Sequence, residues 1–325
     1  HVSQTPLFDL ESSDADRRRV EEALLEAVQT PDAYLTEIAS HLLLAGGKRL
    51  RPMFSVVASQ VAGAPTTEDA VQGGISCELV HLGSLYHDDV MDESPTRRGV
   101  ETVNAKWGNL QAILAGDFLL ARASEIAASL GTEVAALLAR TSGHLCEGQI
   151  EELRHTYNVA RPIDSYLNSI DGKTASLYST AARIGGIVAG HDRATIDALT
   201  TYGTAYGMVF QIVDDVLDLT ATDAQLGKPA GHDMEEGVYT LPVLHTLAAG
   251  GPAASELGSI LGKPLNEVER EKVLHIVRSN GGIATAIEKA RAYVADAEST
   301  CDALPQSATT DAMRKATAAL LATVA

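Results

Sequence analysis

The sequence is poor in aromatic residues, in cysteine and in long apolar runs. Aromatic residues make up only 4% of the 325 positions, and the three cysteines, Cys77, Cys146 and Cys301, are widely spaced without a C-x-x-C pair. Neither a disulfide framework nor a zinc site is therefore indicated. No apolar run reaches the roughly 18 residues of a membrane-spanning helix, and no signal peptide opens the chain. We expect a soluble protein in the reducing cytoplasm.

Positive charge is scarce as well. The chain carries 25 Lys and Arg against 43 Asp and Glu, which gives a net charge of -18. This balance argues against nucleic acid as a partner, because a general basic surface is missing, although a local basic cluster can still hold an anion. Charge is therefore expected to act at individual sites.

Patterns typical of strands and of interdomain linkers are missing, whereas helical periodicity is widespread. Apolar residues recur at three- and four-residue steps before each of two acidic clusters, for example at Ile75, Leu79 and Leu82. No Pro/Ser-rich linker divides the chain. The sequence predicts an all-α fold, a single large-domain helical bundle of about ten or more helices over residues 1–325. We expect residues 1–12 to be a flexible N-terminal segment.

The two acidic clusters share the spacing D-D-x-x-D. The first consists of Asp88, Asp89 and Asp92, and the second of Asp214, Asp215 and Asp218. A helix C-terminus carries partial negative charge, and carboxylates one turn apart repel each other, which costs on the order of 1 kcal/mol per cluster. Carboxylates without histidine or thiolate partners suit Mg2+, which proteins usually hold together with substrate phosphates. The duplication predicts bound metal and bound phosphate, whereas one cluster alone could be a solvated helix end.

Short basic motifs supply the positive charge that a phosphate needs. They are GGKRLRP with Lys48, Arg49 and Arg51, TRRG with Arg97 and Arg98, GKT with Lys173, and LGKP with Lys228. Glycines beside a cation let the backbone approach an anion. One such motif alone proves little, because GKP also occurs at residues 262–264, far from any acidic cluster. The prediction of a phosphate site therefore depends on the association of basic motifs with the acidic clusters.

In this combination the motifs resemble the trans-type (E) polyprenyl diphosphate synthases, and among them the bacterial long-chain members. The matching segments are GGKRLRP, ELVHLGSLYHDDVMDESPTRRG, GDFLLARA, GKT, and FQIVDDVLDLT followed by GKP, in this order between about residue 40 and about residue 245. The resemblance implies a helical bundle of the isoprenoid synthase type around a central cavity. It also implies a Mg-dependent prenyltransferase that condenses isopentenyl diphosphate onto an allylic diphosphate, head to tail, and a homodimer.

The resemblance further implies roles for single residues. Three Mg2+ ions are expected between the clusters, with Asp88, Asp92 and Asp214 as direct ligands and with Asp89, Asp215 and Asp218 supporting them. The allylic diphosphate is expected to meet Arg97, Lys173 and Lys228. The diphosphate of isopentenyl diphosphate is expected to meet Lys48, Arg51, His81 and Arg98. Thr174 and Gln211 are expected near the reacting carbons, where oxygen dipoles stabilise a developing cation.

Product length is expected to depend on the helix before the first cluster. In the family the growing chain runs beside this helix, and bulky residues four or five positions before the cluster stop it early. Here Ser84 and Gly83 occupy those positions, and Val80 and Cys77 lie deeper. These modest side chains leave the wall open over about 10 Å, which predicts a product of about C35 to C50 that would be delivered to a membrane. Close helix packing at small residues is the alternative explanation, with a shorter product of about C20 to C25.

Several features keep other hypotheses open. Val238 stands where many relatives carry a lysine, which removes one expected phosphate cation. The pairs Glu78/His81 and Glu152/His155 have the E-x-x-H spacing of di-iron carboxylate bundles, although Glu152 is more simply explained as part of a solvated helix face. A terpene cyclase is a further alternative within the fold. A non-catalytic subunit of a two-component synthase is another, although such subunits usually lack the aspartates.

Overall fold

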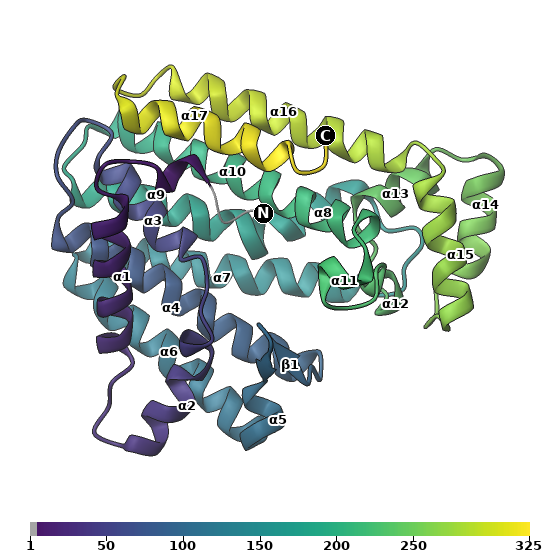
Figure 1. Cartoon of the computed structure of the whole chain (residues 1–325), viewed down its shortest axis with the longest axis horizontal. Coiled ribbons are helices and arrows are strands. Elements are labelled where there is room, and N and C mark those ends of the chain that lie inside the picture. Colours follow the sequence, from purple (N-terminus) through teal and green to yellow (C-terminus); the bar gives the residue numbers. More distant parts are fainter. Residues whose placement is uncertain (1–4) are drawn as a thin grey trace.

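Residues 5–325 are described by the computed structural model of the chain (Figure 1). Residues 1–4 of the expected flexible segment lie outside the described residues. The part that follows differs from the expectation, because Pro6–Phe8 form a short 3-10 helix, η1, whose Leu7 is buried in the core. Thr5 caps this turn by accepting a hydrogen bond from the backbone N–H of Leu7. An apolar anchor and a cap thus hold residues 5–8 on the helical body.

Helices dominate the described chain, which confirms the predicted all-α class. Their bounds are α1 Ser13–Ala27, α2 Ala33–Leu44, α3 Leu50–Ser59, α4 Glu68–Met91, α5 Val103–Trp107, α6 Asn109–Ser129, α7 Thr132–Arg154, α8 Ile163–Ile170, the π-helical turn η2 Asp171–Ala175, α9 Ser176–Val188, α10 Arg193–Thr220, α11 Asp223–Leu226, α12 His232–Glu235, α13 Leu241–Ala248, α14 Gly251–Ile260, α15 Glu267–Arg278, α16 Gly282–Cys301 and α17 Ala308–Leu321. None of the helices between residues 5 and 325 has both the length and the apolar character to cross a bilayer.

A small hairpin is the one β-structure in the described part of the chain. Strands β1 Thr96–Arg97 and β2 Val100–Glu101 pair antiparallel, with Arg97 opposite Val100. Gly99 turns the chain with a φ of 77°, in the left-handed region that glycine tolerates best. The hairpin places Arg97 and Arg98 directly after the first acidic cluster. The sequence patterns did not predict it, because two-residue strands show no alternation.

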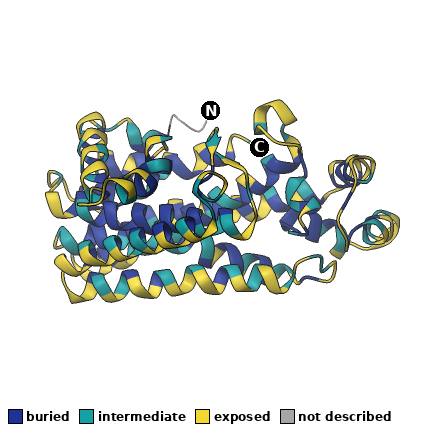
Figure 2. Cartoon of the chain, turned by 90° about the horizontal axis from the view of Figure 1, so that it is seen from below, coloured by how far each residue is buried: buried dark blue, intermediate teal, exposed yellow. Residues whose placement is uncertain are grey.

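The centre of the bundle is formed by the long helices that end in the acidic clusters. Both helices begin with a capped N-terminus, since Thr67 accepts a bond from the Ala70 N–H and Asp192 accepts one from the Thr195 N–H. Their apolar faces are buried, whereas exposed residues gather on the outer helices (Figure 2). One cluster of buried hydrophobic residues extends from Leu7 to Leu321.

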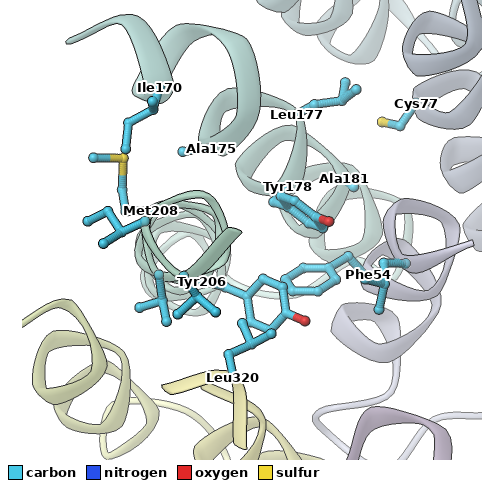
Figure 3. Close-up of a cluster of buried hydrophobic side chains, with 14 of the residues drawn as sticks. Phe54, Cys77, Ile170, Ala175, Leu177, Tyr178, Ala181, Tyr206, Met208 and Leu320 are labelled. Carbon is cyan, nitrogen blue, oxygen red and sulfur yellow. The ribbon is translucent and has the colours of Figure 1, made fainter. Parts of the chain in front are cut away.

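Aromatic rings and small residues form the packing contacts among three central helices. The ring of Phe54 on α3 lies 5.0 Å from that of Tyr178 on α9 and 4.6 Å from that of Tyr206 on α10, measured between centroids (Figure 3). Such edge contacts stabilise a core beyond the area that they bury. Helices α3 and α9 approach so closely that a Cβ on Gly185 would overlap the backbone carbonyl oxygen of Ser55. The position of α9, which follows the GKT motif, therefore depends on this contact.

We expect Gly185→Ala to lower the free energy of unfolding by about 2 kcal/mol, because the added methyl group forces α3 and α9 apart. Gly143→Ala is the matched control, since Gly143 lies on the exposed side of α7 with no atom near its missing Cβ. There the better helix former should raise the free energy of unfolding by about 0.5–1 kcal/mol. Urea unfolding followed by circular dichroism measures both. Equal shifts of the same sign in the two variants would contradict the close α3–α9 contact.

Candidate functional site

The two acidic clusters lie at the C-terminal ends of α4 and α10. Asp88 and Asp89 stand in the last turn of α4, and Asp92 is its C-cap residue. The second cluster occupies the last two turns of α10, which ends at Thr220. In each cluster some carboxylates are buried and others are accessible. The buried ones are Asp89, Asp215 and Asp218, and the partly or fully exposed ones are Asp88, Asp92 and Asp214.

In the first cluster, the buried Asp89 is paired with an arginine of the hairpin, although desolvation still raises its pKa. Arg97 donates from its Nε to both carboxylate oxygens of Asp89, at 2.9 and 3.0 Å, and its Nη2 lies 2.9 Å from Oδ1. Asp88 has no such partner. Desolvation raises the pKa of Asp88 to about 6, opposed by the charge of Lys173 and reinforced by Asp92. The pKa of Asp92 is raised for the same reason, and its cationic neighbour is again Lys173.

The second cluster shows the same division. Asp215 is buried and accepts hydrogen bonds from the Tyr166 hydroxyl at 2.5 Å and from the Gln211 amide nitrogen at 2.9 Å. Asp218 has a buried Oδ1 without a hydrogen-bond partner, 3.7 Å from the Lys228 ammonium group. Asp214 is exposed, yet desolvation by the surrounding protein raises its pKa, with Lys228 opposing this effect. Each cluster therefore holds carboxylates whose charge the protein compensates only in part.

Glu152 and Asp233 connect the two clusters, and neither was predicted. Glu152 on α7 accepts a hydrogen bond from Lys173 at 2.8 Å. The charge of Glu152 contributes to the raised pKa of Asp92 and also to that of Asp233, which desolvation and the neighbouring Asp218 raise to about 7. The clusters thus border one acidic region. The expectation of a solvated face at Glu152 was wrong, because this side chain is only 20% exposed and is paired with a cation.

The E-x-x-H pairs form no metal site in this arrangement. His155 lies 2.8 Å from the Asn158 amide and 3.2 Å from Glu151, while Glu152 is engaged by Lys173. In the described range 5–325, moreover, no group of three or more His, Cys, Asp or Glu side chains converges as in a preformed metal site. The di-iron alternative therefore has no structural support.

The donor set fits a hard divalent cation that is shared with a ligand. The accessible side chains of Asp88, Asp92 and Asp214 offer carboxylate oxygens only, and the buried Oδ1 of Asp218 lacks a hydrogen-bond partner. Mg2+ is commonly held by one or two carboxylates together with phosphate oxygens and water, so a preformed cage is not required. Desolvation raises the pKa of these three accessible carboxyls, so a bound cation would stabilise their ionised forms.

A basic cavity of about 350 Å3 lies beside this acidic region. It is lined by Lys48, Arg49, Arg51, His81 and Arg98, together with Glu78, Tyr178, Phe210 and the backbone of 45–47. The structure thus brings together the four residues predicted for isopentenyl diphosphate. The Arg51 guanidinium stacks 4.6 Å from the Tyr178 ring centroid, and its buried Nε has no hydrogen-bond partner.

Electrostatics in the cavity favour an anion. Desolvation and the surrounding arginines lower the pKa of His81 well below its usual range, so the ring is neutral at pH 7. Arg49 of the GGKRLRP motif also lines the cavity, although it was not among the residues assigned to isopentenyl diphosphate. It has a left-handed backbone (φ 56°), a bond from Nε to Glu21 and a buried Nη1 that has no partner. The GGKRLRP motif contains three basic residues, but their spacing in the sequence does not indicate that all three line one cavity.

Thr174 and Gln211 lie together as expected, because the Thr174 hydroxyl donates to the Gln211 amide oxygen at 2.9 Å. The predicted allylic cations divide between the clusters. Arg97 and Lys173 are next to the first cluster, and Lys228 is next to the second. Val238 supplies no charge, but its backbone N–H donates to the Asp233 carbonyl oxygen at 2.8 Å. Val238 therefore does not replace the positive charge of the lysine that many relatives carry at this position.

The four predicted chain-length residues differ in their surroundings. Cys77 and Val80 are fully buried, and Ser84 is half-buried with its hydroxyl donating to the His81 carbonyl oxygen. Gly83 instead faces α6, where a Cβ would lie 2.9 Å from the carbonyl oxygen of Gly116. Close helix packing, the alternative explanation for small residues here, therefore applies at Gly83. Ser84 stays a predicted wall residue.

Comparisons with known proteins agree with this arrangement. Residues 32–277 match the family model described as polyprenyl synthetase. The chain is 38% identical over 288 residues to the nonaprenyl diphosphate synthase of Mycobacterium tuberculosis, covering 88% of this chain and 86% of that protein. A polyprenyl synthase from Caulobacter crescentus, solved with calcium and isoprenyl diphosphate, superposes with a TM-score of 0.91 at 32% identity over 98% of each chain. A geranylgeranyl pyrophosphate synthase from Corynebacterium glutamicum gives 0.85 at 38% identity, over 96% of each chain.

We expect Asp88→Asn to stabilise the protein without metal or substrate. The folded state raises the pKa of Asp88 from 3.8 to about 6, so it binds this proton more tightly than the unfolded state, and stability falls as pH rises between these values. At pH 7.5 the variant should gain about 1–2 kcal/mol in free energy of unfolding, and this gain should vanish near pH 4.

Urea unfolding in EDTA at both pH values measures this effect. Asp296→Asn, an exposed carboxylate on α16, is the control and should change stability by less than about 0.5 kcal/mol at either pH. If Asp88→Asn lowers the free energy of unfolding at pH 7.5, the Asp88 charge is well compensated in the folded chain, and the prediction is wrong.

Proposed function

Because the chain belongs to the polyprenyl synthetase family, we propose that it lengthens an allylic diphosphate by adding isopentenyl diphosphate units head to tail. The observation that carries this proposal is the division of both acidic clusters into buried and accessible aspartates, next to a basic cavity of about 350 Å3. Such a site can bind one diphosphate through divalent cations at the acidic clusters and a second diphosphate in the basic cavity. A reaction between two diphosphate substrates requires both positions.

The accessible aspartates Asp88, Asp92 and Asp214 would hold Mg2+, with three ions proposed when substrate is bound. When bound, the ions supply Lewis-acid stabilisation of the leaving diphosphate. The chain's own cations act on the same group, since Lys173 and Arg97 at α4 and Lys228 at α10 bring positive charge to the allylic diphosphate. Asp89, Asp215 and Asp218 support the ligands from their buried positions.

The basic cavity binds the diphosphate of isopentenyl diphosphate in this proposal. Lys48, Arg51 and Arg98 provide charge, and the neutral His81 ring provides one N–H donor. Arg51 is held in place by stacking on Tyr178 and has a free donor at Nε. Arg98 already donates to backbone carbonyls at the end of α2, Leu42 and Gly46, which fixes its direction toward the cavity. Binding therefore requires little rearrangement of these side chains.

The reacting carbons lie near Thr174 and Gln211. As the allylic C–O bond breaks, positive charge develops on carbon, and oriented oxygen dipoles stabilise it. The double bond of isopentenyl diphosphate then attacks, and the new cation loses a proton. The carboxylates next to Gln211 have other roles in this proposal, Asp214 as a metal ligand and Asp215 as an acceptor for Tyr166 and Gln211, so we assign the proton to the departing diphosphate.

We propose a long product of about C35 to C50. The small or modest side chains of Ser84, Val80 and Cys77 along α4 support this length, as does the similarity to a nonaprenyl diphosphate synthase. The similarity to a geranylgeranyl pyrophosphate synthase keeps a shorter product as the second candidate.

We further propose a cytoplasmic homodimer that passes its product to a membrane. Helix α6 exposes an apolar stripe at three- and four-residue spacing, with Leu110 75%, Ile113 40% and Leu114 66% exposed. Such a stripe favours burial against a second protein surface. Analytical ultracentrifugation of the wild type and of Leu114→Lys tests this assembly.

The central experiment incubates the purified chain alone with Mg2+, radiolabelled isopentenyl diphosphate and several allylic primers, and resolves the products by chromatography. We expect polyprenyl diphosphates of about C35 to C50 and complete loss of product in EDTA, because the carboxylates alone cannot neutralise the leaving group. Products of about C20 to C25 would establish the shorter-chain alternative. Cyclic hydrocarbons would indicate a terpene cyclase, and no incorporation by the chain alone would indicate a subunit that needs a partner.

We expect Ser84→Phe to shorten the product by several isoprene units, because the ring would project from α4 one turn below Asp88 into the path of the growing chain. Ser84→Ala is the matched control and should leave the length distribution unchanged. Chromatography of products from both variants measures the effect. An unchanged distribution in Ser84→Phe would show that the product does not grow along this side of α4.

A further inference from the structure

A continuous chain of hydrogen bonds leads from a buried tyrosine to the reacting centre. The Tyr166 hydroxyl on α8 donates to Oδ2 of Asp215 at 2.5 Å. The Gln211 amide nitrogen donates to the other carboxylate oxygen, Oδ1, at 2.9 Å. The Thr174 hydroxyl in turn donates to the Gln211 amide oxygen at 2.9 Å. Four side chains from α8, η2 and α10 thus form one connected series, in which the donors converge on Asp215.

The direction of this series follows from the carboxylate. Both oxygens of Asp215 accept hydrogen bonds, so the Gln211 amide turns its NH2 toward Asp215 and its oxygen toward Thr174. Because that oxygen accepts the hydrogen bond of the Thr174 hydroxyl, the hydroxyl oxygen can act only as an acceptor toward its other neighbours. A flipped amide would reverse this, since its NH2 would donate to Thr174 and the hydroxyl proton would point elsewhere. The sign of the dipole near the reacting carbons therefore depends on the carboxylates that the amide nitrogen faces, Asp215 at 2.9 Å and Asp214 at 3.4 Å.

Tyr166 is held firmly enough to fix this carboxylate. Its side chain is only 1% exposed, and the guanidinium of Arg161 lies 5.8 Å from the ring centroid. Arg161 is itself buried and donates to Ser165, Ser169 and the Tyr239 carbonyl oxygen at 2.8–3.1 Å. Without the Tyr166 hydroxyl, Oδ2 of Asp215 would have no donor in a buried position and the carboxylate could rotate away from Gln211.

We propose that Tyr166 is a positioning residue of the prenyl transfer reaction, which sets the direction of the Gln211 amide and of the Thr174 hydroxyl through Asp215. This inference rests on the proposed function. It assigns Asp215 a role as a fixed hydrogen-bond acceptor, since both of its oxygens are engaged by protein donors. The one accessible carboxylate of the same cluster, Asp214, is the one that faces a ligand.

The test compares Tyr166→Phe with Tyr202→Phe. Tyr202 lies on α10 like Gln211, is equally buried, and loses a hydroxyl that donates to the Met313 carbonyl oxygen at 2.6 Å, away from the site. Tyr166→Phe should lower kcat by about 10- to 100-fold, a common cost of removing a group that orients a catalytic one. KM for both diphosphates should stay within about threefold, because their binding groups are untouched. Tyr202→Phe should keep its kcat. Equal kcat values in the two variants, or a loss confined to KM, would overturn the proposal.

A double-mutant cycle tests whether Tyr166 acts through Gln211. In a Gln211→Ala background, adding Tyr166→Phe should lower kcat by less than about threefold, because the group that Tyr166 orients is already gone. Independent, multiplying losses would contradict the relay.

A measurement that needs no turnover separates this inference from the proposed function. The side-chain amide NMR signal of Gln211, identified as the one missing from Gln211→Ala, should shift and exchange faster with solvent in Tyr166→Phe but not in Tyr202→Phe. An unchanged signal would overturn the relay even in an active enzyme. If Tyr166→Phe shows the amide effect but the wild-type chain transfers no prenyl group, the proposed function is overturned, and with it the positioning role of Tyr166 in this reaction.

Discussion

Uncompensated negative charge at the ends of α4 and α10 is the constraint on which the rest of the site depends. Helix dipoles, mutual repulsion and desolvation all oppose carboxylates there. The fold compensates the deepest of them with protein donors, Arg97 for Asp89 and Tyr166 for Asp215. Desolvation nevertheless raises the pKa of every carboxyl in the two clusters, and that of the accessible Asp88 reaches about 6. The folded chain without bound cations is therefore less stable than it could be, and the same uncompensated charge favours cation binding. Such a trade-off between stability and function is common in enzymes.

Helix polarity separates the two kinds of ligand. The basic cavity lies at the N-terminus of α3, where Lys48, Arg49 and Arg51 add to the positive end of the helix dipole. The acidic clusters lie at the C-termini of α4 and α10, where the dipole favours cations. The proposed anion and metal positions therefore agree with helix direction as well as with side-chain charge. In the proposed reaction this arrangement would hold the two diphosphates at separate positions.

Local patterns in the sequence predicted the parts of this site that a short segment can encode. Helical periodicity gave the all-α class, and repeated spacing gave both aspartate clusters. Residues that act through tertiary contacts were beyond such patterns. Glu152 has the pattern of a solvated helix face and is recognised only once α7 meets Lys173. Tyr166 is part of no recognised motif. Gly83 belongs to the contact between α4 and α6 rather than to a channel wall. That contact depends on Gly116, 33 positions further along the chain.

The π-helical turn η2 shows why spacing alone could not place Lys173 and Thr174. These neighbours lie about 100° apart around a regular helix and would not be expected to serve the same site equally well. The wider turn at 171–175 inserts an extra residue between α8 and α9, a feature often found at functional sites. Gly172 packs against the His144 carbonyl oxygen of α7, so Glu152 on that helix comes within 2.8 Å of Lys173. Thr174 meanwhile reaches Gln211 on α10. One irregular turn thus joins Lys173, next to the first acidic cluster, to the hydrogen-bonded pair of Thr174 and Gln211.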